Sequence, residues 1–111
     1  MESKKSKRDK VNEYRRNNRD KIRLDERKRL LKKKYGITII QYNEMFTSQN
    51  GECYICGTHQ DKLRRALAVD HSHHTGKVRG LLCDKCNSLL GYVNDNIETL
   101  KKAIEYLETN N

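Results

Sequence analysis

The first third of the chain is rich in helix-forming residues but has few apolar positions. From Asp9 to Tyr35 there is no glycine or proline, and most residues are good helix formers. The apolar side chains are too sparse for a wide hydrophobic face, since residues 14–21 supply almost nothing to bury. We therefore predict one long helix that ends at Gly36, a residue suited to a helix C-cap, and that lies on a partner or projects from the rest of the chain.

Two shorter helices are predicted by capping residues and by apolar spacing. Thr38, with Gln41 three residues later, forms a capping box that opens a helix ending at residues 50–51. Its apolar positions have the spacing of core residues: Tyr42, Met45 and Phe46. Asp95 and Glu98 are predicted to cap the last helix. That helix places four apolar residues on one face: Ile97, Leu100, Ile104 and Leu107.

A hairpin is predicted between these two helices. Residues 66–69 form a short apolar run that ends at an Asp-His pair and favours a strand. A Thr-Gly turn at 75–76 follows, and residues 77–82 alternate well enough to be the returning strand. A helix is then predicted at about 84–90. Together these elements predict a small α+β fold, with a short hairpin followed by a helix and with further helices on either side.

Composition indicates that so small a fold needs a staple. Of 111 residues, 34% are apolar and 35% charged, so the core must be modest. No apolar stretch follows the N-terminus, and no apolar run approaches about 18 residues. We therefore expect neither secretion nor membrane insertion, and a cytoplasmic location. In a reducing cytoplasm, paired cysteines more often bind zinc than form disulfides.

Charge is concentrated at one end of the chain. Residues 1–34 hold 16 Lys/Arg against 6 Asp/Glu, whereas residues 35–111 hold 8 against 9. Such a segment is typical of a surface that binds a polyanion such as DNA, although a solvated charged helix of no fixed role is the alternative. We divide the chain into a basic helical arm (1–35) and a zinc-stabilised domain (36–111). Four of the arginines predicted to contact DNA lie in the arm: Arg15, Arg16, Arg19 and Arg23.

The four cysteines form two Cys-x-x-Cys pairs, separated by 26 residues: Cys53, Cys56, Cys83 and Cys86. Each pair can present two thiolates from one tight turn, so two pairs complete a four-sulfur zinc site. Because protein would fill all four positions, we predict a structural zinc ion that supplies folding energy. The alternative is two disulfides or unrelated thiols.

Three of the four histidines lie within residues 71–74. Taken alone, such a cluster could be a second metal site or polar surface. Its surroundings are more specific: CxxC at 53–56, DHSH at 70–73, RGLLCDKCN at 79–87 and LG at 90–91. This pattern resembles the recombination endonuclease VII family of ββα-metal (HNH, His-Me finger) nucleases, over roughly half of the chain.

The resemblance implies a metal-dependent DNA endonuclease that leaves 5′-phosphate ends. His71 would be the general base, because imidazole is the side chain whose usual pKa suits removing a proton from water near neutral pH. Asp70 and Asn87 would be oxygen ligands of one catalytic Mg²⁺ or Mn²⁺. His73 would contact a phosphate or orient another group.

Some assignments stay open. Arg79 could grip a DNA phosphate or pair with an acid in the fold. The family's endonuclease VII branch carries an acid where this chain has Leu90, and its junction-resolving members continue into a longer dimerisation region. The DNA substrate could therefore be a branched junction, a homing-type site or a restriction-type site, and a homodimer is one option. A non-catalytic zinc-ribbon DNA-binding protein is the alternative from another class. If the chain is encoded by a phage, its location would be the host cytoplasm.

Overall fold

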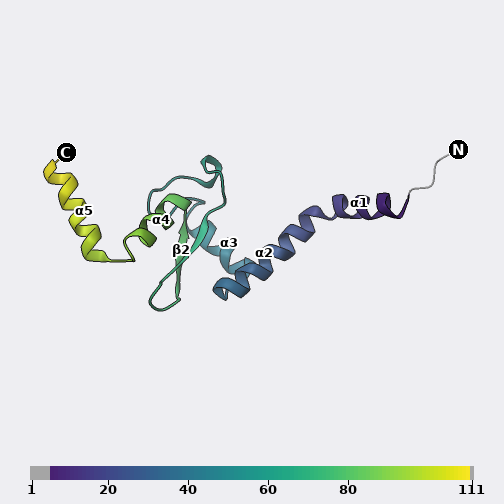
Figure 1. Cartoon of the computed structure of the whole chain (residues 1–111), viewed down its shortest axis with the longest axis horizontal. Coiled ribbons are helices and arrows are strands. Elements are labelled where there is room, and N and C mark those ends of the chain that lie inside the picture. The colour runs from purple at the N-terminus through teal and green to yellow at the C-terminus, as the bar shows by residue number, and fades with distance from the viewer. Residues whose placement is uncertain (1–5, 111) are drawn as a thin grey trace. The chain divides into compact units, whose positions relative to one another are not determined.

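The structure is a computed structural model that describes residues 6–110 (Figure 1). Within this part of the chain lie five α-helices, a short 3-10 helix and one two-stranded antiparallel sheet. The small α+β fold predicted from the sequence is confirmed. The chain divides into two units, Met1–Ile39 and Ile40–Asn111, which are described in turn.

The first unit contains two helices, α1 (Lys7–Asn17) and α2 (Arg19–Tyr35). The prediction of one uninterrupted helix was wrong at Asn18, where the backbone leaves the helical region at φ −112° and ψ 12°. The Asn18 side-chain amide donates to the Tyr14 carbonyl at 2.8 Å and so satisfies the end of α1. Asparagine side chains favour such local bonds over a helix interior, and little apolar burial opposes the break.

The ends of this helical segment follow their local sequence signals. The Ser6 hydroxyl oxygen accepts from the Asp9 N–H at 3.2 Å, as an N-cap does. Gly36 adopts a left-handed conformation at φ 69° and donates its N–H to the Lys32 carbonyl, which confirms the predicted C-cap. No residue of α1 is buried, and α2 buries only Leu31. The unit therefore rests on helix propensity and capping more than on a core.

The second unit begins within α3 (Ile39–Ser48), which contributes one buried aromatic side chain. Tyr42 is 4% exposed, and its hydroxyl donates to the Leu67 carbonyl at 2.6 Å. This bond ties α3 to the segment that leads into the sheet. Met45 and Phe46 are half-buried, so of the three predicted core residues Tyr42 is the one that is fully enclosed.

The hairpin pairs β1 (Ala68–His71) with β2 (Val78–Leu82). The predicted strands are confirmed, although β1 begins two residues later than expected and includes the Asp-His pair. Asp70 is paired with Gly80 and His71 with Val78, so Arg79 is an extra residue on β2. Such a bulge re-aims the side chains around it. The core of the unit lies on and beside this hairpin: Leu67, Val69, Leu81 and Leu82 are each less than 5% exposed.

A turn holding the first cysteine pair is fastened to the hairpin by its backbone. Glu52 and His59 form a single antiparallel bridge, and a 3-10 helix, η1 (Gln60–Lys62), follows. Gln49 reaches β2 from the end of α3: its Oε1 accepts from the Leu81 N–H, and its Nε2 donates to the Leu81 carbonyl, both at 2.9 Å. The sequence analysis missed this role, because a glutamine at a helix end carries no signal for it.

Two helices complete the unit, α4 (Asp84–Tyr92) and α5 (Ile97–Asn110). Helix α4 packs against both strands of the hairpin. The predicted capping of α5 by Asp95 and Glu98 was wrong: the Asn96 side-chain oxygen accepts from the Thr99 N–H at 3.0 Å instead. The apolar face of α5 is largely exposed, with Ile104 at 57%. None of the helices described is long and apolar enough to cross a membrane.

Candidate functional site

The four cysteines converge from the turn after α3 and from the junction of β2 with α4. The sulfur atoms of Cys53, Cys56, Cys83 and Cys86 all lie within 4.8 Å of one another. The Cys56 and Cys83 sulfurs are 3.8 Å apart, far beyond a disulfide bond. Two thiolates bound tetrahedrally to one zinc ion at about 2.3 Å would be roughly 3.8 Å apart. The cluster therefore has the spacing of a zinc site.

The thiols of the cluster differ in their pKa values. The side-chain and backbone hydrogen bonds of Thr58 lower the pKa of Cys56 to about 6. Burial raises the pKa of Cys86 well above its usual value. Four thiolates this close would repel one another, and a divalent metal is the group that holds them deprotonated together. Cys83 is the N-cap residue of α4, so a metal here would hold the hairpin, α4 and the first cysteine turn together.

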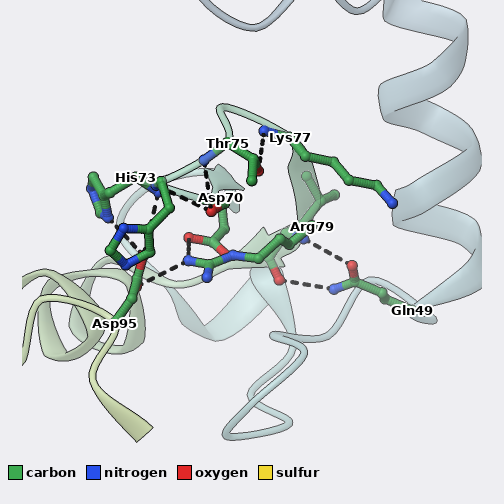
Figure 2. Close-up of polar contacts among 10 residues, drawn as sticks. Gln49, Asp70, His73, Thr75, Lys77, Arg79 and Asp95 are labelled. Carbon is green, nitrogen blue, oxygen red and sulfur yellow. Dashed lines mark hydrogen bonds and ion pairs between the residues drawn. The ribbon is translucent and has the colours of Figure 1, made fainter.

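A second polar cluster lies near the turn of the hairpin, between the end of β1 and the start of β2 (Figure 2). Asp70, only 5% exposed, accepts two hydrogen bonds from Arg79, at 2.7 Å from Nε and 3.0 Å from Nη2. The bulge brings this arginine beside the carboxylate. The sequence left open whether Arg79 contacts a DNA phosphate or pairs with an acid in the fold. The structure shows the pairing with an acid. The pKa of Arg79 is raised, chiefly by its hydrogen bonds to Asp70, so the guanidinium stays charged.

Asp95 joins this cluster from the loop between α4 and α5 (Figure 2). Its Oδ1 accepts from Arg79 Nη2 at 3.2 Å, and its Oδ2 lies 2.9 Å from His73 Nδ1. The hydrogen bonds from His73 and Arg79 lower its pKa to about 2. Sequence reasoning missed this role because it treated Asp95 as a helix cap. The Asn94-Asp95 pair is a sequence signal for the left-handed turn seen there, since both residue types tolerate that conformation, but not for the partners of the carboxylate.

The three clustered histidines differ in their surroundings. His71 is half-buried at the end of β1, and its ring centroid is 5.3 Å from that of His73. His74 is exposed on the turn, where its N–H donates to the Ser72 hydroxyl. The structure therefore brings the rings of His71 and His73 together, whereas His74 lies on the turn.

The remaining predicted residues lie on helices. Asn87 is half-buried in α4, the helix that packs on the hairpin. The candidate DNA-contact arginines of the arm are all exposed, on α1 and α2: Arg15, Arg16, Arg19 and Arg23. Three of them line a shallow hollow of about 530 Å³ together with Asp9 and Asn12. Its lining holds three arginines and one aspartate.

Fold and site together define a small α+β protein in which a hairpin and its following helix are joined at a four-cysteine cluster and carry a histidine-rich strand end. Residues 28–109 match the family described as recombination endonuclease VII. The chain belongs to this family, as its sequence motifs suggested.

Two curated relatives are similar over 74 residues, which is 66% of this chain. They are the Gene 59 proteins of Mycobacterium phage D29, 51% identical, and Mycobacterium phage L5, 53% identical. The matched segment is 44% of the length of each relative, so this chain is similar to part of a longer protein in both cases.

Proposed function

We propose that this protein is a metal-dependent DNA endonuclease in which His71 is the general base. The observation that carries the proposal is the placement of Asp70 and His71 at the end of β1, beside the Arg79 bulge and next to the His73 ring. A phosphodiester bond is hydrolysed by a water that has lost a proton, and imidazole is suited to accept that proton near neutral pH. Membership of the endonuclease VII family supports the same activity.

The two residues predicted to bind the catalytic metal, Asp70 and Asn87, carry the oxygen donors that a hard divalent cation prefers. Asp70 supplies a buried carboxylate, and Asn87 supplies an amide oxygen from the helix packed on the hairpin. Both Asp70 oxygens accept from Arg79, but each carboxylate oxygen can accept more than one partner. Asp70 could therefore serve a cation and Arg79 together. When bound, Mg²⁺ or Mn²⁺ would offset charge on the scissile phosphate and on the leaving oxygen.

The arm has the charge to bind the DNA backbone. Its exposed arginines can neutralise phosphates and release counterions, which gives affinity without base readout. Arg79 differs from them, because two carboxylates already hold its guanidinium. Arg79 would reach a phosphate only while sharing those bonds. The same arm is the feature that favours the second candidate function, a DNA-binding protein without catalysis.

One assay separates the two functions. Purified zinc-loaded protein is incubated with supercoiled plasmid and with a synthetic four-way junction, each with Mg²⁺ or without added Mg²⁺. We expect Mg²⁺-dependent nicking or cutting, with 5′-phosphate ends that a ligase can reseal. The ratio of junction to plasmid cleavage then reports the substrate preference. Tight binding of both DNAs with no cleavage in Mg²⁺ or Mn²⁺ would identify the binding module instead.

A further inference from the structure

Asp95 occupies an unusual position for a loop acid. Its side chain is only 6% exposed, whereas the His73 ring that it contacts is 54% exposed. Three donors converge on its carboxylate: the His73 ring nitrogen Nδ1, the His73 backbone N–H and the Arg79 guanidinium. The carboxylate therefore lies under the histidine and fastens the loop before α5 to the hairpin.

The backbone that delivers Asp95 is strained. Asn94 and Asp95 have φ values of 53° and 56°, two successive left-handed residues that are not glycine. Side chains with a Cβ rarely adopt this conformation, although Asn and Asp tolerate it best. Strain of this kind persists where surrounding contacts enforce it, and it gathers at functional sites.

We propose that Asp95 is a positioning residue of the nuclease site, which fixes the His73 ring through Nδ1 and holds Arg79 against Asp70. This inference rests on the function proposed above. Because Asp95 accepts from Nδ1, Nε2 is the ring nitrogen left for the substrate: it accepts a hydrogen bond in the neutral Nδ1–H ring and donates to a phosphate oxygen in the imidazolium. Arg79 is held by Asp70 on one side and Asp95 on the other, so the two acids set its place beside His71. Asp95 would act through His73 and Arg79, not on DNA directly.

The test needs a variant that removes the carboxylate without adding backbone strain. Asp95→Gly does so, because glycine adopts a positive φ at no steric cost. Asn94→Gly is the matched control, since it makes the same change at the preceding left-handed position and leaves the carboxylate intact. Asp95→Asn should be intermediate: an amide has one acceptor oxygen, whereas Asp95 uses one oxygen for each partner.

Three quantities are measured on the intact zinc-loaded protein. Loss of an orienting partner typically costs 10- to 100-fold in activity, so Asp95→Gly should lower the cleavage rate at saturating DNA by about that factor. The Kd for DNA should change less than about threefold. In long-range ¹H–¹⁵N spectra of neutral imidazole, His73 should be mainly the Nδ1–H tautomer in the wild type and should gain Nε2–H in Asp95→Gly. Asn94→Gly should leave all three unchanged.

The outcomes separate this inference from the proposed function. An Asp95→Gly variant with wild-type cleavage and an unchanged His73 tautomer overturns the inference while the nuclease assignment stands. Equal losses in Asp95→Gly and Asn94→Gly also overturn it, because loop flexibility would then be the cause. If the wild-type protein cleaves no DNA, the proposed function fails and the catalytic part of the inference fails with it. The tautomer spectra still decide whether Asp95 orients His73.

Discussion

The two units of this chain are stabilised by different kinds of interaction: local ones in the first, and contacts between distant residues in the second. In Met1–Ile39 the helices follow from local signals, namely good helix formers, the Ser6 cap and the Gly36 stop. In Ile40–Asn111 the shape depends on residues far apart in sequence, as in the bond from Tyr42 to the Leu67 carbonyl and in the four-cysteine cluster. The basic excess lies almost wholly in the first unit, and the candidate chemistry lies in the second.

This contrast indicates which substitutions each unit tolerates. The arm can lose charges with little effect on folding, since α1 buries none of its side chains and α2 buries only Leu31. The second unit has a small core and should unfold when one cysteine of the cluster is replaced. The predictions below test that difference, beginning with the largest effect.

Replacing Cys83 should abolish the fold of the second unit. Cys83→Ser removes one of the four predicted zinc ligands, at the junction of β2 with α4, and structural zinc sites in small domains supply about 10–16 kcal/mol of apparent binding energy. Elemental analysis should find about one zinc per wild-type chain and much less in the variant, and thermal unfolding should lose its cooperativity. Lys85→Ser, an exposed position between the two cysteines of the same pair, is the control. A zinc-free Cys83→Ser protein that unfolds like the wild type would contradict the structural role of the site.

Neutralising the arm should weaken DNA binding without unfolding the protein. Four exposed arginines are changed to glutamine: Arg15, Arg16, Arg19 and Arg23. The slope of log K against log salt should flatten by about 0.9 for each DNA phosphate that the variant no longer neutralises. Zinc content and helical circular dichroism should be retained. Lys101→Gln with Lys102→Gln, two exposed charges on α5, should change the slope much less. An unchanged slope in the arginine variant would assign the arm to another task, such as dimerisation.

Gly51→Ala should destabilise the second unit by about 2 kcal/mol or more. Its φ of 69° alone costs an alanine about 1–2 kcal/mol, and the added Cβ would lie 2.7 Å from His59 Nε2 and 2.9 Å from Phe46 Cζ. Gly91→Ala makes the same change within α4, where a Cβ would meet nothing within 4 Å. That variant should be neutral or more stable by about 0.5–1 kcal/mol. Urea unfolding of the two proteins measures both, and equal effects would contradict the account of this turn.

The smallest predicted effect is on how the stability of the fold changes as the pH falls. Hydrogen bonds from His73 and Arg79 lower the pKa of Asp95 from near 3.8 to about 2, so folding keeps this carboxylate ionised. A lowered pKa contributes stability that is complete above the unfolded value and is lost as the pH falls from about 4 to about 2. Asp95→Asn should therefore show a shallower loss of stability over that range than the wild type. Identical acid unfolding curves would contradict the bonds seen at Asp95.

Much of this arrangement could be predicted from the sequence where the signal is local. The cysteine spacing predicted the cluster, the apolar alternation predicted the hairpin, and Gly36 predicted the end of α2. The break at Asn18 was missed because it reflects a weak preference of one side chain that nothing buried opposes.

The roles of Gln49 and Asp95 could not be read in this way, because their partners are distant in sequence. Gln49 bonds Leu81, 32 residues later, and Asp95 bonds His73, 22 residues earlier. The Arg79 bulge decides which face of β2 meets Asp70, and a one-residue change of register is not visible in an alternating pattern. The catalytic roles of Asp70, His71, His73 and Asn87 stay predictions, since they concern chemistry that only an assay tests.

The central claim is that His71 activates water, and cleavage by His71→Ala tests it most directly. The variant and its matched control, His74→Ala on the adjoining turn, are compared with the wild type on supercoiled plasmid in Mg²⁺ at saturating protein. Zinc content and DNA affinity are checked in each protein. General-base catalysis is worth about 10²–10⁴-fold, so His71→Ala should cleave slower by that factor while His74→Ala stays within about twofold of the wild type. A His71→Ala protein that cleaves at the wild-type rate would contradict the account.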